Sequence, residues 1–171
     1  MLLNAAWVLV TQQGWVWVSV VVIALLVVTL GLIMRRLTAL APEGRADRII
    51  LDGTFGAYLG WVSVATCANI AAAGVASGWS LSPRGDEWLA VAVLAAAAGV
   101  GVMLAFTIGG RFAVAAAMAW GLGWIAIARL FDEPASTLVG ISAIVAVAVV
   151  IAVSGVRCIG RVGAPAVARA A

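Results

Sequence analysis

One apolar segment carries most of the side chains that could recognise a ligand. It reads YLGWVSVATCANIAAAG, residues 58–74, and includes a tyrosine, a tryptophan, a cysteine and an asparagine. On a helix, at about 100° per residue, five of its side chains fall within an arc of about 100°: Tyr58, Trp61, Val62, Ala65 and Asn69. Aromatic rings that can stack on a planar molecule, with an amide that can hold one polar group, are typical of a small-molecule site.

Asn69 also has a structural interpretation. A buried amide can bond to a neighbouring helix, a contact worth about 0.6 to 2 kcal/mol in a membrane. The hydroxyls of Ser19, Ser63 and Thr66 are expected to bond to the backbone of their own helices. The sequence leaves both interpretations of Asn69 open.

Catalysis and ion coupling have little support. Apart from Arg129 at the end of one of them, the apolar segments contain no Asp, Glu, Lys, Arg or His, whereas a coupled pump normally buries ionisable residues. Two loop pairs could form a carboxylate or divalent-cation site, but topology and helix capping are the favoured roles; the pairs are Asp86/Glu87 and Asp132/Glu133. Cys67 and Cys158 lack metal-ligand spacing, and no disulfide is expected between them. We therefore expect a protein that is not an enzyme and that holds no metal.

Membrane-spanning helices must position these residues. The chain has 171 residues, 65% of them hydrophobic and 10% charged, with a mean hydropathy of +1.20, so it is expected to be an integral membrane protein. Apolar runs of about 20 residues, enough for a helix of about 30 Å, occur five times: Trp15–Met34, Phe55–Trp79, Trp88–Ile108, Phe112–Leu130 and Ser136–Val156. The prediction is an all-α membrane bundle, residues 1–171, with five full transmembrane helices plus an N-terminal partial helix.

The partial helix, Leu2–Thr11, would rise only about 15 Å before the polar turn that follows it. Folding back into the membrane would place the charged amino terminus near the middle of the bilayer, at a cost of several kcal/mol. We therefore expect this segment to run along the outer interface or protrude, or an upstream portion to be missing from the chain.

The arginines are distributed unequally between the two sides of the membrane. Because consecutive spans alternate in direction, eight of the ten fall on one side: Arg35, Arg36, Arg45, Arg48, Arg111, Arg157, Arg161 and Arg169. The positive-inside rule then predicts that the 35–54 loop and the C-terminal tail, residues 158–171, are cytoplasmic. Residues 43–53 of that loop form either a short interfacial helix or a solvated connector. The net charge of +3 does not by itself indicate nucleic-acid binding.

Tryptophans and small residues suggest how the helices are placed. Five tryptophans at predicted outer ends are expected to form an aromatic belt: Trp7, Trp15, Trp17, Trp79 and Trp88. Trp61, Trp120 and Trp124 lie away from the helix ends and are expected in the interior. The runs AVAVLAAAAGVGVMLA and AVAAAMAWGLGW allow close helix packing, with contact to a flat ligand as the second interpretation; their glycines are Gly99, Gly101, Gly121 and Gly123.

Two motifs resemble the tryptophan-rich sensory protein or translocator protein (TspO/MBR) family. LNAAW, with Asn4 and Trp7, is similar to the signature of the family's third helix. YLGWVSVATCAN is similar to that of the fifth, through Tyr58, Leu59, Trp61, Val62, Ala65 and Asn69. The chain departs from the second signature at Ala57, Val64 and Ala68, where the family has proline, phenylalanine and leucine. By this resemblance residues 2–79 are the TspO-like part and 86–157 are three additional helices. The family's first two helices, with their W-x-P-P motif, have no counterpart.

The resemblance implies a bundle in a bacterial plasma (inner) membrane that binds porphyrins, sterols or other flat hydrophobic molecules. It implies that the ligand-binding residues are Asn4, Trp7, Tyr58, Trp61, Ala65 and Asn69, and it makes Asn4 a candidate for the neighbour of Asn69. The expected function is binding or passing a hydrophobic small molecule, a tetrapyrrole (a porphyrin-type ligand) or isoprenoid-like lipid. The expected partners are the lipid bilayer and this molecule, with a homo-oligomer as an option and no nucleic acid. The alternative is a structural or accessory membrane subunit that packs through its Gly/Ala-rich faces and has no ligand.

Overall fold

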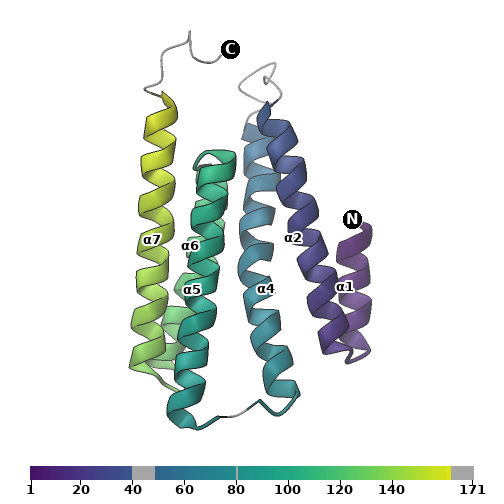
Figure 1. Cartoon of the computed structure of the whole chain (residues 1–171), viewed down its shortest axis with the longest axis vertical. Helices are drawn as coiled ribbons and strands as arrows, with labels where there is room; N and C mark the ends of the chain where they lie inside the picture. Colours follow the sequence, from purple (N-terminus) through teal and green to yellow (C-terminus); the bar gives the residue numbers. More distant parts are fainter. Residues whose placement is uncertain (40–48, 80, 163–171) are drawn as a thin grey trace.

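The computed structural model describes residues 1–39, 49–79 and 81–162, and this part of the chain is helical without a strand. Figure 1 shows a bundle of long helices that run roughly side by side. The elements are α1 Leu2–Gln12, α2 Val16–Ala39, the π-helix η1 Leu51–Gly56, α4 Ala57–Ala76, α5 Pro83–Ile108, α6 Phe112–Phe131 and α7 Thr137–Val162. The all-α prediction is confirmed.

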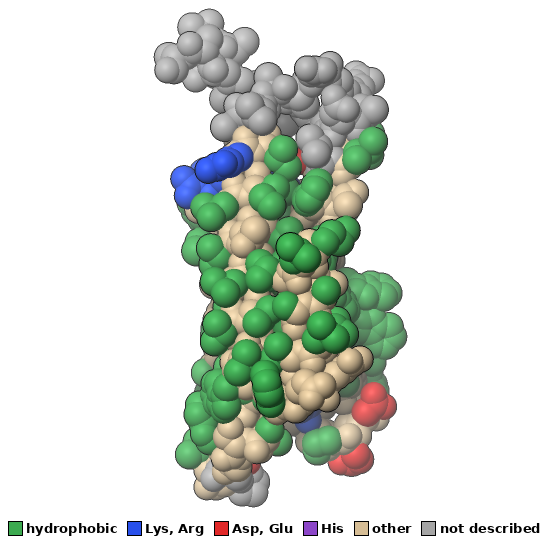
Figure 2. Space-filling view, turned by 90° about the vertical axis from the view of Figure 1, so that its right-hand side faces the viewer, with side chains coloured by type: hydrophobic (Ala, Val, Ile, Leu, Met, Phe, Trp, Pro, Cys, Tyr) green, Lys and Arg blue, Asp and Glu red, His purple; other side chains and the backbone are tan. Residues whose placement is uncertain are grey.

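Five of these helices are long and apolar enough to cross a membrane, as predicted. They are Val16–Thr38, Asp52–Ala76, Arg84–Ile108, Phe112–Phe131 and Thr137–Gly160. In the space-filling view, hydrophobic side chains cover the visible side of the bundle, and the coloured charged groups gather near its two ends (Figure 2). Because an apolar lateral surface is stable only in contact with lipid, the protein is an integral membrane protein.

The two ends of the bundle differ in charge. We call the end where α5 begins and α6 ends the acidic end; it carries Asp86, Glu87, Asp132 and Glu133. The opposite end, the basic end, carries Arg35, Arg36, Arg111 and Arg157. Among the described residues, the separation of charge that the sequence predicts is therefore present in the fold.

At the basic end, Arg111 joins three elements. Its guanidinium forms an ion pair with Asp52 of η1, and Nη2 donates a hydrogen bond of 2.8 Å to Thr38 Oγ1 of α2. Within the 43–53 segment, residues 49–53 are helical, whereas 43–48 lie outside the described residues. The described residues of this segment continue through η1 into α4, so they are the beginning of a membrane-spanning helix and not a separate interfacial helix.

The turn between α5 and α6 requires glycine. Gly109 and Gly110 have φ values of 80° and 64°, a left-handed conformation that side chains with a Cβ rarely adopt. A Cβ on Gly110 would also collide with the Ser154 carbonyl oxygen of α7. This turn therefore brings the start of α6 close to α7.

α1 folds back beside α2 (Figure 1). Gly14, with φ of 72°, reverses the chain after α1, and Leu3 and Trp7 pack against the hydrophobic core. The expectation that this segment lies along the interface or protrudes is therefore wrong. No residue of α1 is buried, and Met1 and Leu2 are exposed, so the segment lies along the outside of α2.

Candidate functional site

The stripe on α4 contacts α2 through Asn69. Asn69 Nδ2 donates a hydrogen bond of 3.0 Å to Ser19 Oγ of α2, and Ser19 Oγ lies 2.7 Å from the Val16 carbonyl oxygen. Since a hydroxyl has one proton, Ser19 donates to Val16 and accepts from Asn69. Ser19 is fully buried, so the structural interpretation of Asn69 holds and its partner is Ser19.

Other hydroxyls on α4 behave as expected. Ser63 Oγ donates to the Leu59 carbonyl at 2.8 Å, and Thr66 Oγ1 donates to the Val62 carbonyl at 2.8 Å. Each of these bonds spans one helical turn, so neither hydroxyl is directed at a ligand.

Asn4 does not lie against Asn69. It is exposed on α1, and the hydrogen-bond partner of Asn69 is Ser19, so the predicted Asn4–Asn69 contact is wrong. The reason is that α2 lies between α1 and α4 (Figure 1). Trp7 is half-buried, and its indole N–H is buried without an acceptor in the described part of the chain.

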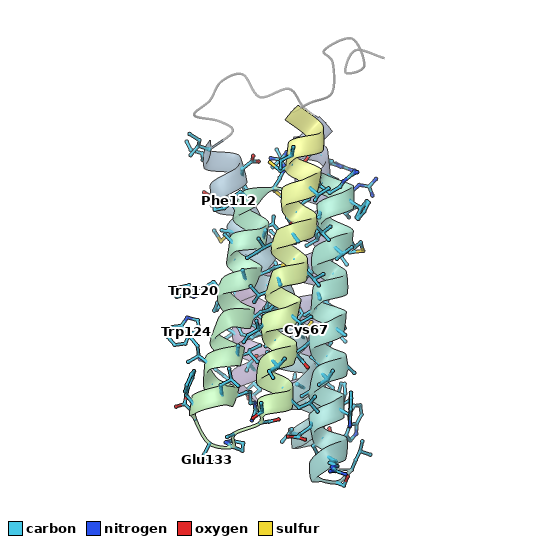
Figure 3. All side chains as sticks on the ribbon, turned by 90° about the vertical axis from the view of Figure 1, so that its left-hand side faces the viewer. Cys67, Phe112, Trp120, Trp124 and Glu133 are labelled. Carbon is cyan, nitrogen blue, oxygen red and sulfur yellow. The ribbon has the colours of Figure 1, made fainter. Side chains whose placement is uncertain are left out.

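Trp61, Trp120 and Trp124 are outside the bundle, contrary to the prediction. They are 52%, 63% and 53% exposed, and Trp120 and Trp124 point away from α6 (Figure 3) with ring centroids 5.7 Å apart. The buried face of α6 consists instead of Val114, Ala115, Met118, Leu122 and Ala126. Trp61 lies at the edge of the arc that the stripe occupies and so faces outward.

A large apolar hollow lies on another face of α4. It is a cavity of about 480 Å³ between α4, α5 and α6, closed at the acidic end by the start of α7 and the loop before it. We call it the α4–α5–α6 groove. Its lining is Val64, Cys67, Ala68, Ala71, Ala90, Val93, Leu94, Ala97, Leu122, Ile125, Ala128, Arg129, Asp132, Glu133, Pro134 and Val139.

Small side chains create the space in this groove. Five of its lining residues are alanines, and Cys67 points between the helices while Glu133 lies at the end of α6 (Figure 3). The stripe residues Tyr58, Ala65 and Asn69 are on a different face of α4 and do not line the groove. The structure therefore does not bring the predicted ligand-binding residues together around a cavity.

The polar groups of the groove are held by the loop between α6 and α7. Arg129 Nη1 donates a hydrogen bond of 3.1 Å to the Pro134 carbonyl, and the Ala135 N–H donates to Glu133 Oε2 at 3.2 Å. Ser136 Oγ donates to Glu87 Oε1 of α5 at 2.5 Å. These bonds fix the loop as the rim of the groove, which we call the mouth.

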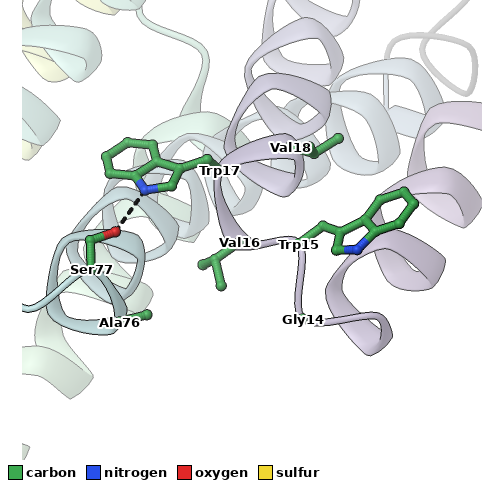
Figure 4. A pocket seen from close by; sticks show the side chains of 7 residues that line it. All are labelled: Gly14, Trp15, Val16, Trp17, Val18, Ala76 and Ser77. Atoms are coloured by element: carbon green, nitrogen blue, oxygen red, sulfur yellow. Dashed lines mark hydrogen bonds between the residues drawn. The ribbon is translucent and has the colours of Figure 1, made fainter.

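A second hollow, of about 400 Å³, lies at the acidic end between the α1–α2 turn and the end of α4 (Figure 4). Trp17 Nε1 donates a hydrogen bond of 2.7 Å to Ser77 Oγ, and Trp17 contacts Trp79 with ring centroids 5.3 Å apart. Trp15, Trp17, Trp79 and Trp88 are all exposed, as an aromatic belt requires. This hollow is a surface feature of the interfacial end.

A model of the TSPO-like protein family matches residues 1–156. The chain belongs to the TSPO-like protein family. The match extends from α1 into α7, beyond the part in which the two motifs lie. No curated protein and no solved structure matches this chain. Membership indicates a membrane protein of a family that is generally not enzymatic.

The two family motifs do not indicate the position of the groove in this TSPO-like protein. Its signals in the sequence are the alanine-rich runs, which leave space, and Arg129 with Asp132 and Glu133 at the end of one of them. The glycines of these runs are of two kinds. A Cβ on Gly101 or Gly121 would meet neighbouring side chains, so these two lie at helix contacts. A Cβ on Gly99 or Gly123 would meet nothing within 4 Å. No cluster of three metal-ligating side chains occurs among the residues that the structure describes.

Proposed function

We propose that this TSPO-like protein binds a hydrophobic small molecule, a tetrapyrrole or an isoprenoid-like lipid, in the α4–α5–α6 groove. The observation that carries the proposal is one apolar hollow of about 480 Å³ with three ionisable side chains among its lining residues. Ligand sites usually have volumes of about 300 to 1,000 Å³ and combine apolar walls with a few polar groups. Binding or passive passage of the ligand needs no acid, base or metal.

The ligand would enter from the side of the bundle. Ala68 and Ala71 of α4 and Ala128 of α6 line the groove and are also exposed. An opening of this kind faces the acyl chains, in which such a molecule is already dissolved. Because lipid is as apolar as the groove, discrimination must come from fit and from the polar mouth.

Retinol, an uncharged fluorescent isoprenoid, tests the proposal. We expect saturable energy transfer from tryptophan to retinol in purified protein, with affinity reduced at least about tenfold, or about 1.4 kcal/mol, by Ala71→Leu. Ala71 lines the groove, whereas its neighbour Ala72 is exposed and does not, so Ala72→Leu is the matched control and should leave the affinity within about twofold. Protoporphyrin quenching of tryptophan, in the same variants, tests the tetrapyrrole class. Unsaturable signals, or equal effects of the two substitutions, would reject the site.

We place the protein in a bacterial inner membrane with its basic end in the cytoplasm, on the basis of the arginine distribution. Cys158, exposed near the end of α7, reports this orientation. In intact spheroplasts, an impermeant maleimide should leave Cys158 unlabelled in a Cys67→Ser variant until the membrane is permeabilised. Labelling before permeabilisation would reverse the orientation.

One observation favours the alternative, a subunit that packs on a partner or on itself. Trp120 and Trp124 are exposed near the middle of α6, far from the interfaces that tryptophan prefers, and Gly123 beside them is uncovered. A second copy packed on this face would shield both indoles. Native mass spectrometry of wild type and Gly123→Leu should then show a dimer that the substitution weakens; a monomer in both proteins rejects this alternative.

A further inference from the structure

We propose that the α4–α5–α6 groove selects hydrophobic cations over hydrophobic anions of the same size. This inference rests on the proposed function and adds the charge of the ligand, so that of the two proposed ligand classes it disfavours porphyrins that carry anionic propionate groups. The juxtaposition that carries it is an apolar cavity of about 480 Å³ whose charged lining residues are Asp132, Glu133 and Arg129. Two carboxylates therefore face one guanidinium.

Arg129 is held within the loop and supplies the single positive charge of the groove lining. Its Nη1 is committed to the Pro134 carbonyl at 3.1 Å, within the same loop that holds the two carboxylates. Glu133 accepts from the Ala135 N–H through Oε2, and Asp132 is exposed with no hydrogen bond to its carboxylate in the described part of the chain. The uncompensated charge at the mouth is therefore the carboxylate of Asp132, with Glu133 beside it.

The net charge of the whole acidic end is also negative. The acidic end carries four carboxylates and two arginines, Arg84 and Arg129, so its net charge is −2. Glu87 is held toward the loop by the hydrogen bond from Ser136, and Asp86 accepts from the Leu81 N–H at 3.0 Å. Next to a low-dielectric medium, such a field acts more strongly than it would in bulk water.

Charge should decide which of two equally sized hydrophobic ligands the groove binds, because apolar contacts are similar in the groove and in lipid. A ligand that leaves lipid for an alanine-lined groove exchanges one apolar surrounding for another. A cation whose charge is spread over an aromatic body loses little hydration on entering, since dispersed charge is weakly hydrated. The ligand class is therefore a monocation with an apolar body that fits about 480 Å³.

Tetraphenylphosphonium and tetraphenylborate test this, because they have nearly the same shape and opposite charge. Cys67 lines the groove, so a bound ion should slow its chemical modification. The Cys158→Ser variant is placed in zwitterionic nanodiscs, and the rate at which methyl methanethiosulfonate modifies Cys67 is measured at increasing concentrations of each ion. Empty nanodiscs give the partitioning of each ion, so that affinities refer to equal concentrations in the bilayer. We expect tetraphenylphosphonium to protect Cys67 with at least about tenfold higher affinity than tetraphenylborate.

Variants that change only charge locate the effect. Asp132→Asn with Glu133→Gln keeps the side-chain shapes and the acceptor for Ala135, and should weaken tetraphenylphosphonium binding about tenfold without weakening retinol binding. Asp86→Asn removes one carboxylate from the same end outside the groove lining, and should weaken it less than about twofold.

Two results would overturn the inference: equal or tighter binding of tetraphenylborate, or unchanged tetraphenylphosphonium affinity in the double variant. In either case saturable retinol binding that Ala71→Leu reduces would leave the proposed function intact. Absence of saturable binding of every probe would overturn both, since no ligand would then occupy the groove.

Discussion

α4 presents two faces that differ in how their space is used. On one face, Asn69 meets Ser19 of α2 and the contact is closed; on another, Cys67, Ala68 and Ala71 border a groove of about 480 Å³. The first face carries the polar and aromatic residues that attract attention in the sequence, and the second carries mostly small apolar ones. In this bundle the amide therefore joins two helices, whereas small side chains leave room for a ligand.

The largest expected effect comes from enlarging the α2 side chain that contacts the closed face of α4. Ser19 is fully buried, so Ser19→Leu should lower the free energy of unfolding by about 2 to 4 kcal/mol, from overpacking and from the loss of the partner of Asn69. Unfolding of the purified protein by dodecyl sulfate, followed by circular dichroism, measures this.

The groove supplies the matched control for that substitution. Ala68 lines the groove and is exposed, so Ala68→Leu should change the free energy of unfolding by less than about 0.5 kcal/mol. Equal destabilisation by Ser19→Leu and Ala68→Leu would show that both faces are closed.

A smaller effect is expected from the polar contact itself. A double-mutant cycle with Ser19→Ala and Asn69→Ala should give a coupling of about 0.6 kcal/mol, with an upper value near about 2 kcal/mol. Retinol affinity should stay within about twofold in Asn69→Ala. A coupling near zero together with a large loss of retinol binding would move the ligand to the closed face.

Hydropathy predicted the spans well because they must match the bilayer. α6, Phe112–Phe131, differs from its prediction by one residue at its end. α5 begins at Pro83 rather than Trp88, because Ser82 caps it by accepting a hydrogen bond from the Gly85 N–H at 3.1 Å. Proline is common in the first turn of a helix, so the segment SPRGDE contains the residues that indicate where α5 begins.

The site was predicted less well, for a physical reason. In a soluble bundle apolar residues mark the interior, but in a membrane both the interior and the lipid-facing surface are apolar. Periodicity therefore groups Tyr58, Ala65 and Asn69 on one side of α4 without saying which neighbour covers them. Periodicity also does not show that Trp61 faces lipid. Nor does it show that alanines, and not aromatic residues, line the cavity.

The smallest effect on stability and on ligand affinity is expected at Trp61. The indole is 52% exposed and lies outside both the Ser19–Asn69 contact and the groove. Trp61→Phe should therefore change the free energy of unfolding by less than about 0.5 kcal/mol. It should also leave the affinity for retinol unchanged, as measured by the intrinsic fluorescence of retinol. A large loss of affinity would place the ligand against the outer edge of the stripe, where the resemblance of the Tyr58–Asn69 motif to the family signature had pointed. An unchanged affinity would mean that in this chain the motif serves helix packing and the groove serves the ligand.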